Sequence, residues 1–107
     1  MPFPYEGPEQ LRQPIVAALT RVVDPEVALS IVDVGLVYGV TVTDDTLHVL
    51  LTMTSAACPV ADEILEEVET ELDRAAPAAL RIEVELVWEP PWTADRMSER
   101  AKRFMAW

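Results

Sequence analysis

The chain holds a single cysteine, Cys58, and a single histidine, His48, among its 107 residues. One cysteine excludes an internal disulfide and a zinc site built from thiolates alone. The three glycines are too scattered to form a phosphate-binding loop. No apolar run approaches the roughly 20 residues that a membrane-spanning helix needs, and the length is usual for one domain. We therefore expect one small domain with no membrane association.

The opening sequence, MPFPYEGPEQ, contains no basic residue and no apolar stretch before a cleavage site. A secretory signal needs both, so we expect a cytoplasmic protein. The prolines and the glycine of this stretch favour irregular structure. The expected organisation is an irregular N-terminal arm over residues 1–10, followed by a single domain over residues 11–107.

Basic residues are scarce, because eight lysines and arginines stand against 19 aspartates and glutamates, for a formal charge of −11. Nucleic-acid binding depends on cationic side chains that neutralise phosphates, so we expect no nucleic-acid partner. Seven acids and no base lie between Asp62 and Asp73, whereas bases outnumber acids from Asp95 to Trp107. The favoured interpretation is a solvated helix face and a basic tail. The alternative is that the contrast orients a protein partner.

Apolar residues recur at helical and strand spacings along the chain. In QPIVAALTRVV they predict a helix with Pro14 in its first turn, ended by Asp24-Pro25. Two alternating stretches around Asp44-Asp45 predict a β-hairpin, and Ser98 is a candidate cap for a last helix. The predicted elements are a helix over 13–23, strands over 38–43 and 46–53, a helix over 60–75, a strand over 81–88, and a short final helix.

This order, α-β-β-α-β-α, is typical of an α+β domain. We expect a small three-stranded sheet with helices packed on one face, and we expect Glu83 and Glu85 on the open face of the sheet.

Cys58 is the first candidate functional residue, since it follows the second predicted strand and precedes Pro59 at the start of a helix. Unpaired N–H groups and the helix dipole favour a thiolate there, and the hydroxyls of Thr54 and Ser55 could donate hydrogen bonds to it. The alternative is a buried cysteine that acts as a small apolar residue. A thiol-dependent enzyme needs a base beside the thiol. By alternation His48 points away from the core, most of a strand's length from Cys58, which favours an ordinary surface histidine.

Three further motifs have both structural and functional interpretations. DPE, with Asp24 and Glu26, is a helix stop, and VDVG, with Asp33, is a turn that leads into the hairpin. WEPPW, residues 88–92, is either an aromatic wall over one end of the core or an exposed docking patch. We favour the wall for Trp88 and docking for Trp92, and we count Trp88, Pro91 and Trp92 as candidate partner-binding residues.

Together, VVDPEVALSIVDVGLVYGV, LTMTSAACPVADEI and VELVWEPPWTADRMSERAK resemble one family in order and spacing. They are similar to the small metal–sulfur cluster assembly factors, which include the SufT-like proteins and the N-terminal domain of PaaD-like proteins. The resemblance covers residues 11–102. It implies an α+β fold like that of other iron–sulfur assembly domains, and a role in iron–sulfur protein maturation without catalysis on a metabolite.

The same resemblance implies the site residues. Cys58 matches the key cysteine of the family, which we expect to contact the metal. The acidic loop residues carried over by position are Asp24, Glu26 and Asp33, and the strand-exit hydroxyls are those of Thr54 and Ser55.

Iron–sulfur clusters usually take about four protein ligands, mostly thiolates, and one chain offers a single thiol. We therefore expect Cys58 to contact a cluster or iron transiently, in a site shared between two chains or with a partner. The expected partners are the iron–sulfur assembly machinery and client apo-proteins, with a homodimer as a further option. Two alternatives stay open: an adaptor in which Cys58 only packs, and a cysteine-dependent enzyme, which is less favoured.

Overall fold

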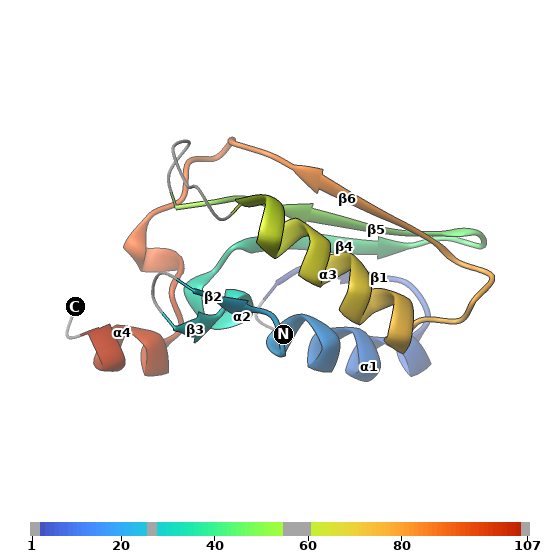
Figure 1. Ribbon diagram of the computed structural model, residues 1–107, viewed down its shortest axis with the longest axis horizontal. Helices are drawn as coiled ribbons and strands as arrows, with labels where there is room; N and C mark the ends of the chain where they lie inside the picture. The colour runs from blue at the N-terminus through green and yellow to red at the C-terminus, as the bar shows by residue number, and fades with distance from the viewer. Residues whose placement is uncertain (1–2, 26–27, 55–60, 106–107) are drawn as a thin grey trace.

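The main sheet has four strands in the order β1-β4-β5-β6, which run over Tyr5–Glu6, Val37–Val42, Thr46–Leu51 and Arg81–Leu86 (Figure 1). The computed structural model describes residues 3–25, 28–54 and 61–105. The predicted α+β class is confirmed, whereas the predicted sheet of three strands is wrong. The fourth strand, β1, pairs in parallel with β4 and lies within the segment that we expected to be irregular.

The N-terminal segment is ordered by contacts with residues far away in the sequence. Tyr5 lies opposite Val40 in the sheet, and the amide of Val40 donates to the carbonyl of Pro4 at 3.0 Å. The hydroxyl of Tyr5 donates to the carbonyl of Pro8 at 2.7 Å, and burial raises the pKa of this hydroxyl, an effect that Arg12 opposes. Local sequence pattern could not reveal this strand, because its partner is remote.

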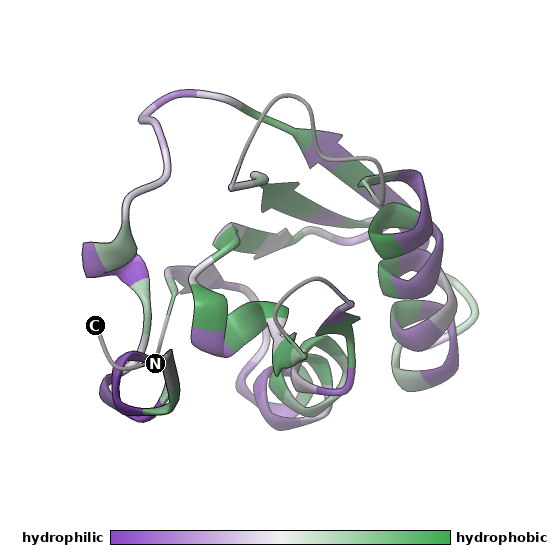
Figure 2. Ribbon diagram, turned by 60° about the vertical axis from the view of Figure 1, so that its left-hand side comes forward, coloured by the Kyte–Doolittle hydropathy of each residue, from purple (hydrophilic) through white to green (hydrophobic). Residues whose placement is uncertain are grey.

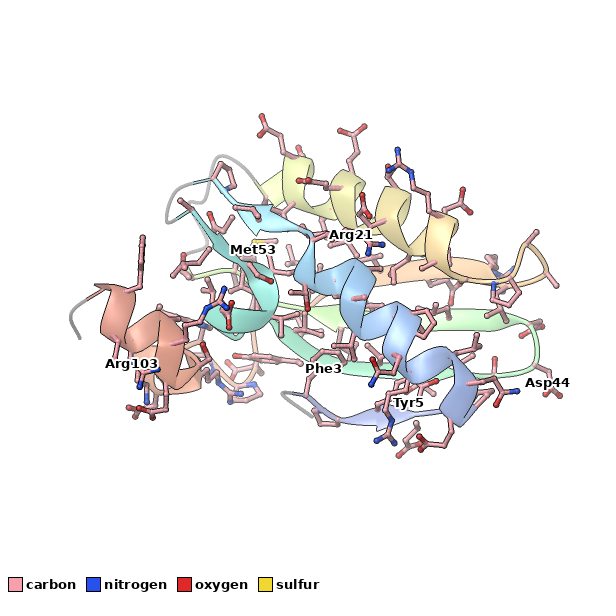
Figure 3. The ribbon with its side chains drawn as sticks, turned by 90° about the horizontal axis from the view of Figure 1, so that it is seen from below. Phe3, Tyr5, Arg21, Asp44, Met53 and Arg103 are labelled. Carbon is pink, nitrogen blue, oxygen red and sulfur yellow. The ribbon has the colours of Figure 1, made fainter. Side chains whose placement is uncertain are left out.

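Two long helices, α1 (Glu9–Thr20) and α3 (Ala61–Ala75), cover one face of the sheet. Figure 2 shows their apolar residues turned toward the sheet and their hydrophilic residues turned outward. Arg21, just after α1, lies beside α3 and forms an ion pair with Glu71 at 2.7 Å (Figure 3). The prediction that Pro14 stands in the first turn is wrong, because α1 begins at Glu9 and holds Pro14 in its interior.

Short elements occupy the segment that we expected to be a loop before the hairpin. Strands β2 (Val23–Asp24) and β3 (Leu29–Ser30) form a separate antiparallel pair, and helix α2 (Ile31–Val34) follows at once. The chain ends with a 3-10 turn, η1 (Ala94–Arg96), and helix α4 (Glu99–Met105). The predicted order of elements therefore lacked β1, β2, β3, α2 and η1. Within the described ranges no helix is both long and apolar enough to cross a membrane.

The predicted alternation in β5 and β6 is confirmed. Leu47, Val49 and Leu51 of β5 are fully buried beneath the helices, and Glu83 and Glu85 of β6 are exposed. Strand β5 ends at Leu51 and β6 at Leu86, so both are shorter than expected. β5 and β6 are parallel because α3 connects them, and both therefore end at the same edge of the molecule. Figure 3 places Met53, after β5, and Asp44, in the hairpin turn, at opposite ends of the sheet.

Candidate functional site

The described parts of all four sequence motifs meet at the end of the sheet where β5 and β6 finish. The DPE strand joins the VDVG segment, because the amide of Ile31 donates to the carbonyl of Val22 at 2.9 Å. The VDVG segment joins the exit of β5, where the amide of Thr52 donates to the carbonyl of Leu36 at 2.8 Å. The WEPPW segment leaves β6 beside that exit, with the amide of Val87 donating to Leu51. Main-chain hydrogen bonds thus gather motifs that lie far apart in sequence.

The segment that leads to Cys58 starts from a stem formed by Thr52 and Met53. Thr52 and Met53 are both buried, and Thr54 is exposed. The alternation that we predicted through residue 53 stops at Leu51, which is why Thr52 is buried although the pattern assigned it to the polar face. The Thr52 hydroxyl is buried with no hydrogen-bond partner among the described residues. Cys58 and Ser55 lie outside the described residues, between this stem and the start of α3.

Asp24 lies in β2, where only 3% of its surface is exposed. Its carbonyl accepts a hydrogen bond from the amide of Ala28 at 2.8 Å, which closes a tight turn. Ala28 takes a φ of 60° in that turn. Asp24 is therefore a buried residue at the end of the sheet where the motifs meet. Glu26 lies outside the described residues.

Asp33 faces the C-terminal segment. One carboxylate oxygen accepts from the Ser98 hydroxyl at 2.9 Å, and the other lies 3.5 Å from an Arg100 nitrogen. The Asp33 carbonyl also accepts from the amide of Ser98 at 2.8 Å. Through these contacts Asp33 holds the start of α4 in place.

The aromatic motif packs differently from our expectation. Trp88, which we assigned to a wall over the core, is 44% exposed. Trp92, which we assigned to docking, is partly buried against the core, and its indole N–H donates to the carbonyl of Val34 at 2.8 Å. The exposures of the two tryptophans are therefore the reverse of those we favoured, and Pro91 is exposed. Alternation does not extend past β6, so it gave no guide to these side chains.

Tyr38 and Arg96 complete the attachment of the C-terminal segment, and sequence reasoning missed both. The Tyr38 hydroxyl donates to the carbonyl of Pro90 at 2.7 Å, and the Arg96 guanidinium lies 4.4 Å from the centre of the Tyr38 ring. An aromatic residue next to a predicted turn was the only available signal.

The described residues do not form a metal site by themselves, since they contain no group of three His, Cys, Asp or Glu side chains placed to hold a metal ion. His48 lies on the open face of β5, with its Nε2 atom 3.0 Å from a Glu85 oxygen, in line with the prediction of a surface histidine. The described structure gives the exit of β5 and the start of α3, and the sequence places Cys58 between them.

The protein is a small α+β domain with a four-stranded sheet and two covering helices. Its sequence carries one thiol, between β5 and α3. The chain belongs to the iron–sulfur cluster assembly protein family, whose model matches residues 12–86. The resemblance to SufT-like proteins is thereby confirmed.

Three comparisons give the degree of similarity. The chain is 46% identical over 95 residues to the Fe-S protein maturation auxiliary factor YitW of Bacillus subtilis, which covers 88% of this chain and 92% of that protein. It is 44% identical over 82 residues to the Fe-S protein maturation auxiliary factor SufT of Staphylococcus aureus, which covers 76% and 92%. The crystal structure of a domain of unknown function, DUF59, from Bacillus anthracis superposes with a TM-score of 0.85 at 39% identity, over 92% of this chain and 93% of that one.

Proposed function

We propose that this protein is a maturation factor for iron–sulfur proteins that acts through protein partners and performs no catalysis on a metabolite. The observation that carries the proposal is its identity of 46% to a protein named as an Fe-S protein maturation auxiliary factor, over 88% of the chain. A similarity over 88% of the chain cannot be confined to one motif. The word auxiliary in that name favours assistance to other proteins over turnover of a substrate.

Within this role we propose that Cys58 contacts a cluster or an iron ion during transfer. Support comes from its position, because the segment that bears it follows the rigid Thr52–Met53 stem and precedes α3. A single thiol cannot complete a shell of about four ligands, so the remaining ligands come from a second chain, a partner or an external thiol. We also propose that the hydroxyls of Thr54 and Ser55, which precede the cysteine in sequence, and the acids Asp24 and Glu26 contribute to this contact. Asp33 supports the site through the C-terminal segment.

The partners that we propose are the proteins of the assembly machinery and the client apo-proteins, in the cytoplasm. Trp88 and Pro91 are exposed on the segment beside the site and offer a rigid contact surface for them. Trp92 holds this surface in place through its bond to the Val34 carbonyl.

Deletion of the coding sequence from the native host tests the proposed role. The activities of several iron–sulfur enzymes in the extract should fall, while enzymes without a cluster keep theirs, and the wild-type protein should restore the loss. Equal activities with and without the protein, under iron limitation as well as in rich medium, would refute a role in maturation.

The role of Cys58 needs a separate test. Wild-type protein and the Cys58→Ser variant are each incubated anaerobically with iron, sulfide and a small thiol, then desalted and assayed for iron. We expect the wild type to retain iron or cluster absorbance and the variant to lose most of it. If both retain the same iron and the variant still restores the deletion strain, the thiol has no role as a ligand, although the maturation role itself survives.

A further inference from the structure

The outer edge of β6 has free hydrogen-bonding groups. β6 is the last strand of the sheet, and among the described residues no strand pairs with its outer side. The amides of Arg81 and Val87 donate inward to Asp45 and Leu51 of the β5 side. In a parallel pair, alternate residues bond to the same neighbour, so the intervening residues present their N–H and C=O groups to the free edge. These residues are Ile82, Val84 and Leu86.

The apolar face of β6 is only half covered. Leu47, Val49 and Leu51 of the adjoining strand are fully buried, whereas Ile82, Val84 and Leu86 opposite them remain partly exposed. The helices therefore cover the apolar side chains of β5 completely but leave apolar surface along the edge strand. Such surface is sufficient to receive the side chains of one more strand.

The wall of α3 beside this edge is acidic. Asp62, Glu66, Glu69 and Asp73 recur at spacing i, i+4, i+7 and i+11, which places them in one stripe along the helix. Glu69 and Asp73 line the space next to β6, while Glu71, on the other side of the helix, bonds to Arg21 of α1. Within the described parts of the chain, no member of the stripe forms an ion pair, since Arg74 goes to Glu71 and Arg81 to Glu83.

A groove of about 460 Å³ lies between α3 and the start of β6. It is lined by Glu69, Thr70 and Asp73 of the helix and by Leu80, Arg81 and Ile82 of the strand. Figure 1 shows β6 along the upper margin of the sheet, and α3 is in contact with β6. The groove lies at the start of the free strand edge, with Leu80 and Ile82 as its apolar side chains and Arg81 beside them. Its carboxylates, Glu69 and Asp73, form no ion pair with the described residues.

We propose that this groove binds an extended segment of a partner protein, rich in lysine or arginine and in β-branched residues, which adds to β6 as a fifth strand. Backbone bonds to Ile82, Val84 and Leu86 would supply affinity, as in other cases of strand addition. Basic side chains on one face of the segment meet the α3 stripe, and those on the other face meet Glu83 and Glu85.

Charge selects this occupant over a second copy of the chain. Two copies that joined through β6 would bring Glu83 and Glu85 of one against the same acids of the other, and each copy carries a formal charge of −11. Like charges opposite each other destabilise a sheet. The inference concerns the sheet edge alone, so it survives if Cys58 binds no metal, and its failure leaves the maturation role intact.

A peptide with the repeat Val-Lys-Lys serves as the probe, because this repeat places lysine on both faces of an extended segment. Two matched peptides serve as controls: one with glutamate in place of lysine, and one that keeps the lysines but is N-methylated at successive central residues, which removes its backbone donors. Amide NMR of the protein reports the site. We expect only the first peptide to slow the hydrogen exchange of the Ile82, Val84 and Leu86 amides. The Glu83 and Glu85 amides should be protected already by β5 and serve as internal controls.

Paired protein variants test the electrostatic part. Glu66→Gln/Glu69→Gln removes two carboxylates from the stripe, and Glu63→Gln/Glu67→Gln removes two from the opposite side of the same helix with the same change in net charge. We expect the first pair to weaken peptide binding about fivefold and the second by less than about twofold. Val84→Pro, which removes one outward donor but no bond to β5, should abolish binding while the circular dichroism spectrum stays unchanged.

Several results would overturn the proposal. One is the absence of saturable binding of the lysine peptide below about 1 mM. Another is equal binding of the N-methylated peptide, which would show charge attraction without strand addition. Self-association of the wild-type protein that Val84→Pro abolishes would assign the edge to a second copy instead. Should Val84→Pro fail to fold, the exchange pattern of the wild-type amides decides alone.

Discussion

Gly35 ends α2 with a φ of 85°, in the left-handed region that side chains disfavour. The backbone carbonyl of Arg96 lies where a Cβ atom of residue 35 would stand. Gly35 therefore serves two needs at once, since it turns the chain into β4 and lets the C-terminal segment approach closely.

Gly35→Ala should destabilise the protein by about 3 kcal/mol, because the left-handed conformation is strained and the Arg96 backbone must move. Chemical denaturation followed by circular dichroism measures this. Gly39→Ala is the matched control, since a Cβ there would meet the Pro4 carbonyl at an ordinary 3.9 Å. We expect that variant to be neutral or stabilised by up to about 1 kcal/mol. Equal losses for both variants would contradict the close approach of Arg96.

A substitution at Thr52 should have the opposite effect on the free energy of unfolding. Its hydroxyl is buried without a partner among the described residues, so Thr52→Val keeps the shape and removes an unsatisfied polar group. The free energy of unfolding should stay constant or rise by up to about 1 kcal/mol. A loss of more than about 1 kcal/mol would show that the hydroxyl is engaged by residues 55–60, and would make Thr52 part of the candidate site.

Single residues were predictable where the physical rule is local. Ser98 was predicted to cap the last helix, and its hydroxyl accepts from the amide of Ala101 at 3.1 Å. The exposures of Trp88 and Trp92 were not predictable, because both follow the end of β6, and Trp92 is held by a bond to the remote Val34 carbonyl.

At the scale of elements, the C-terminal segment is fastened to α2 and β4 by side chains from both sides. Trp92 bonds to the Val34 carbonyl, Tyr38 to the Pro90 carbonyl, and Ser98 to the Asp33 carboxylate. The VDVG and WEPPW motifs are therefore bonded to each other. These contacts explain why their residue types occur together, without assigning either motif to metal binding.

Asp33→Ala should loosen α4 while the rest of the domain stays folded. The variant removes the acceptor of the Ser98 hydroxyl and the Arg100 contact, so we expect a local loss of about 1 kcal/mol. Hydrogen exchange of the α4 amides should accelerate about fivefold, with α1 and α3 unchanged. Asp95→Ala, an exposed carboxylate in η1, serves as the control and should leave α4 unchanged. Equal acceleration in all helices would contradict a local role.

The main helices and the β4–β5 hairpin were predictable because their apolar periodicity extends over many residues. The strands β1, β2 and β3 have two residues each, and α2 has four, so no period could develop. β1 is a strand because it pairs with β4, which is remote in sequence. The proline and glycine signals around it indicated irregular structure, and tertiary pairing prevailed over that local preference.

At the scale of the whole molecule, we propose two regions as contact surfaces for partners. One is the end of the sheet where the described motif stems converge, next to the segment that holds Cys58. The other is the free edge of β6, with the acidic groove at its start. The candidate site could be predicted from sequence as a set of motifs, because their order and spacing resemble a family. Their convergence could not be predicted, since it depends on main-chain bonds such as Thr52 to Leu36.

The central claim is that this protein promotes the insertion of clusters into other proteins. The most direct measurement is the iron and sulfide content of one iron–sulfur enzyme, purified anaerobically from host cells that lack the protein and from cells that carry the wild type or Cys58→Ser. We expect low occupancy without the protein, full occupancy with the wild type, and low occupancy with the variant, at equal amounts of enzyme polypeptide. Full occupancy in the cells that lack the protein would contradict the claim.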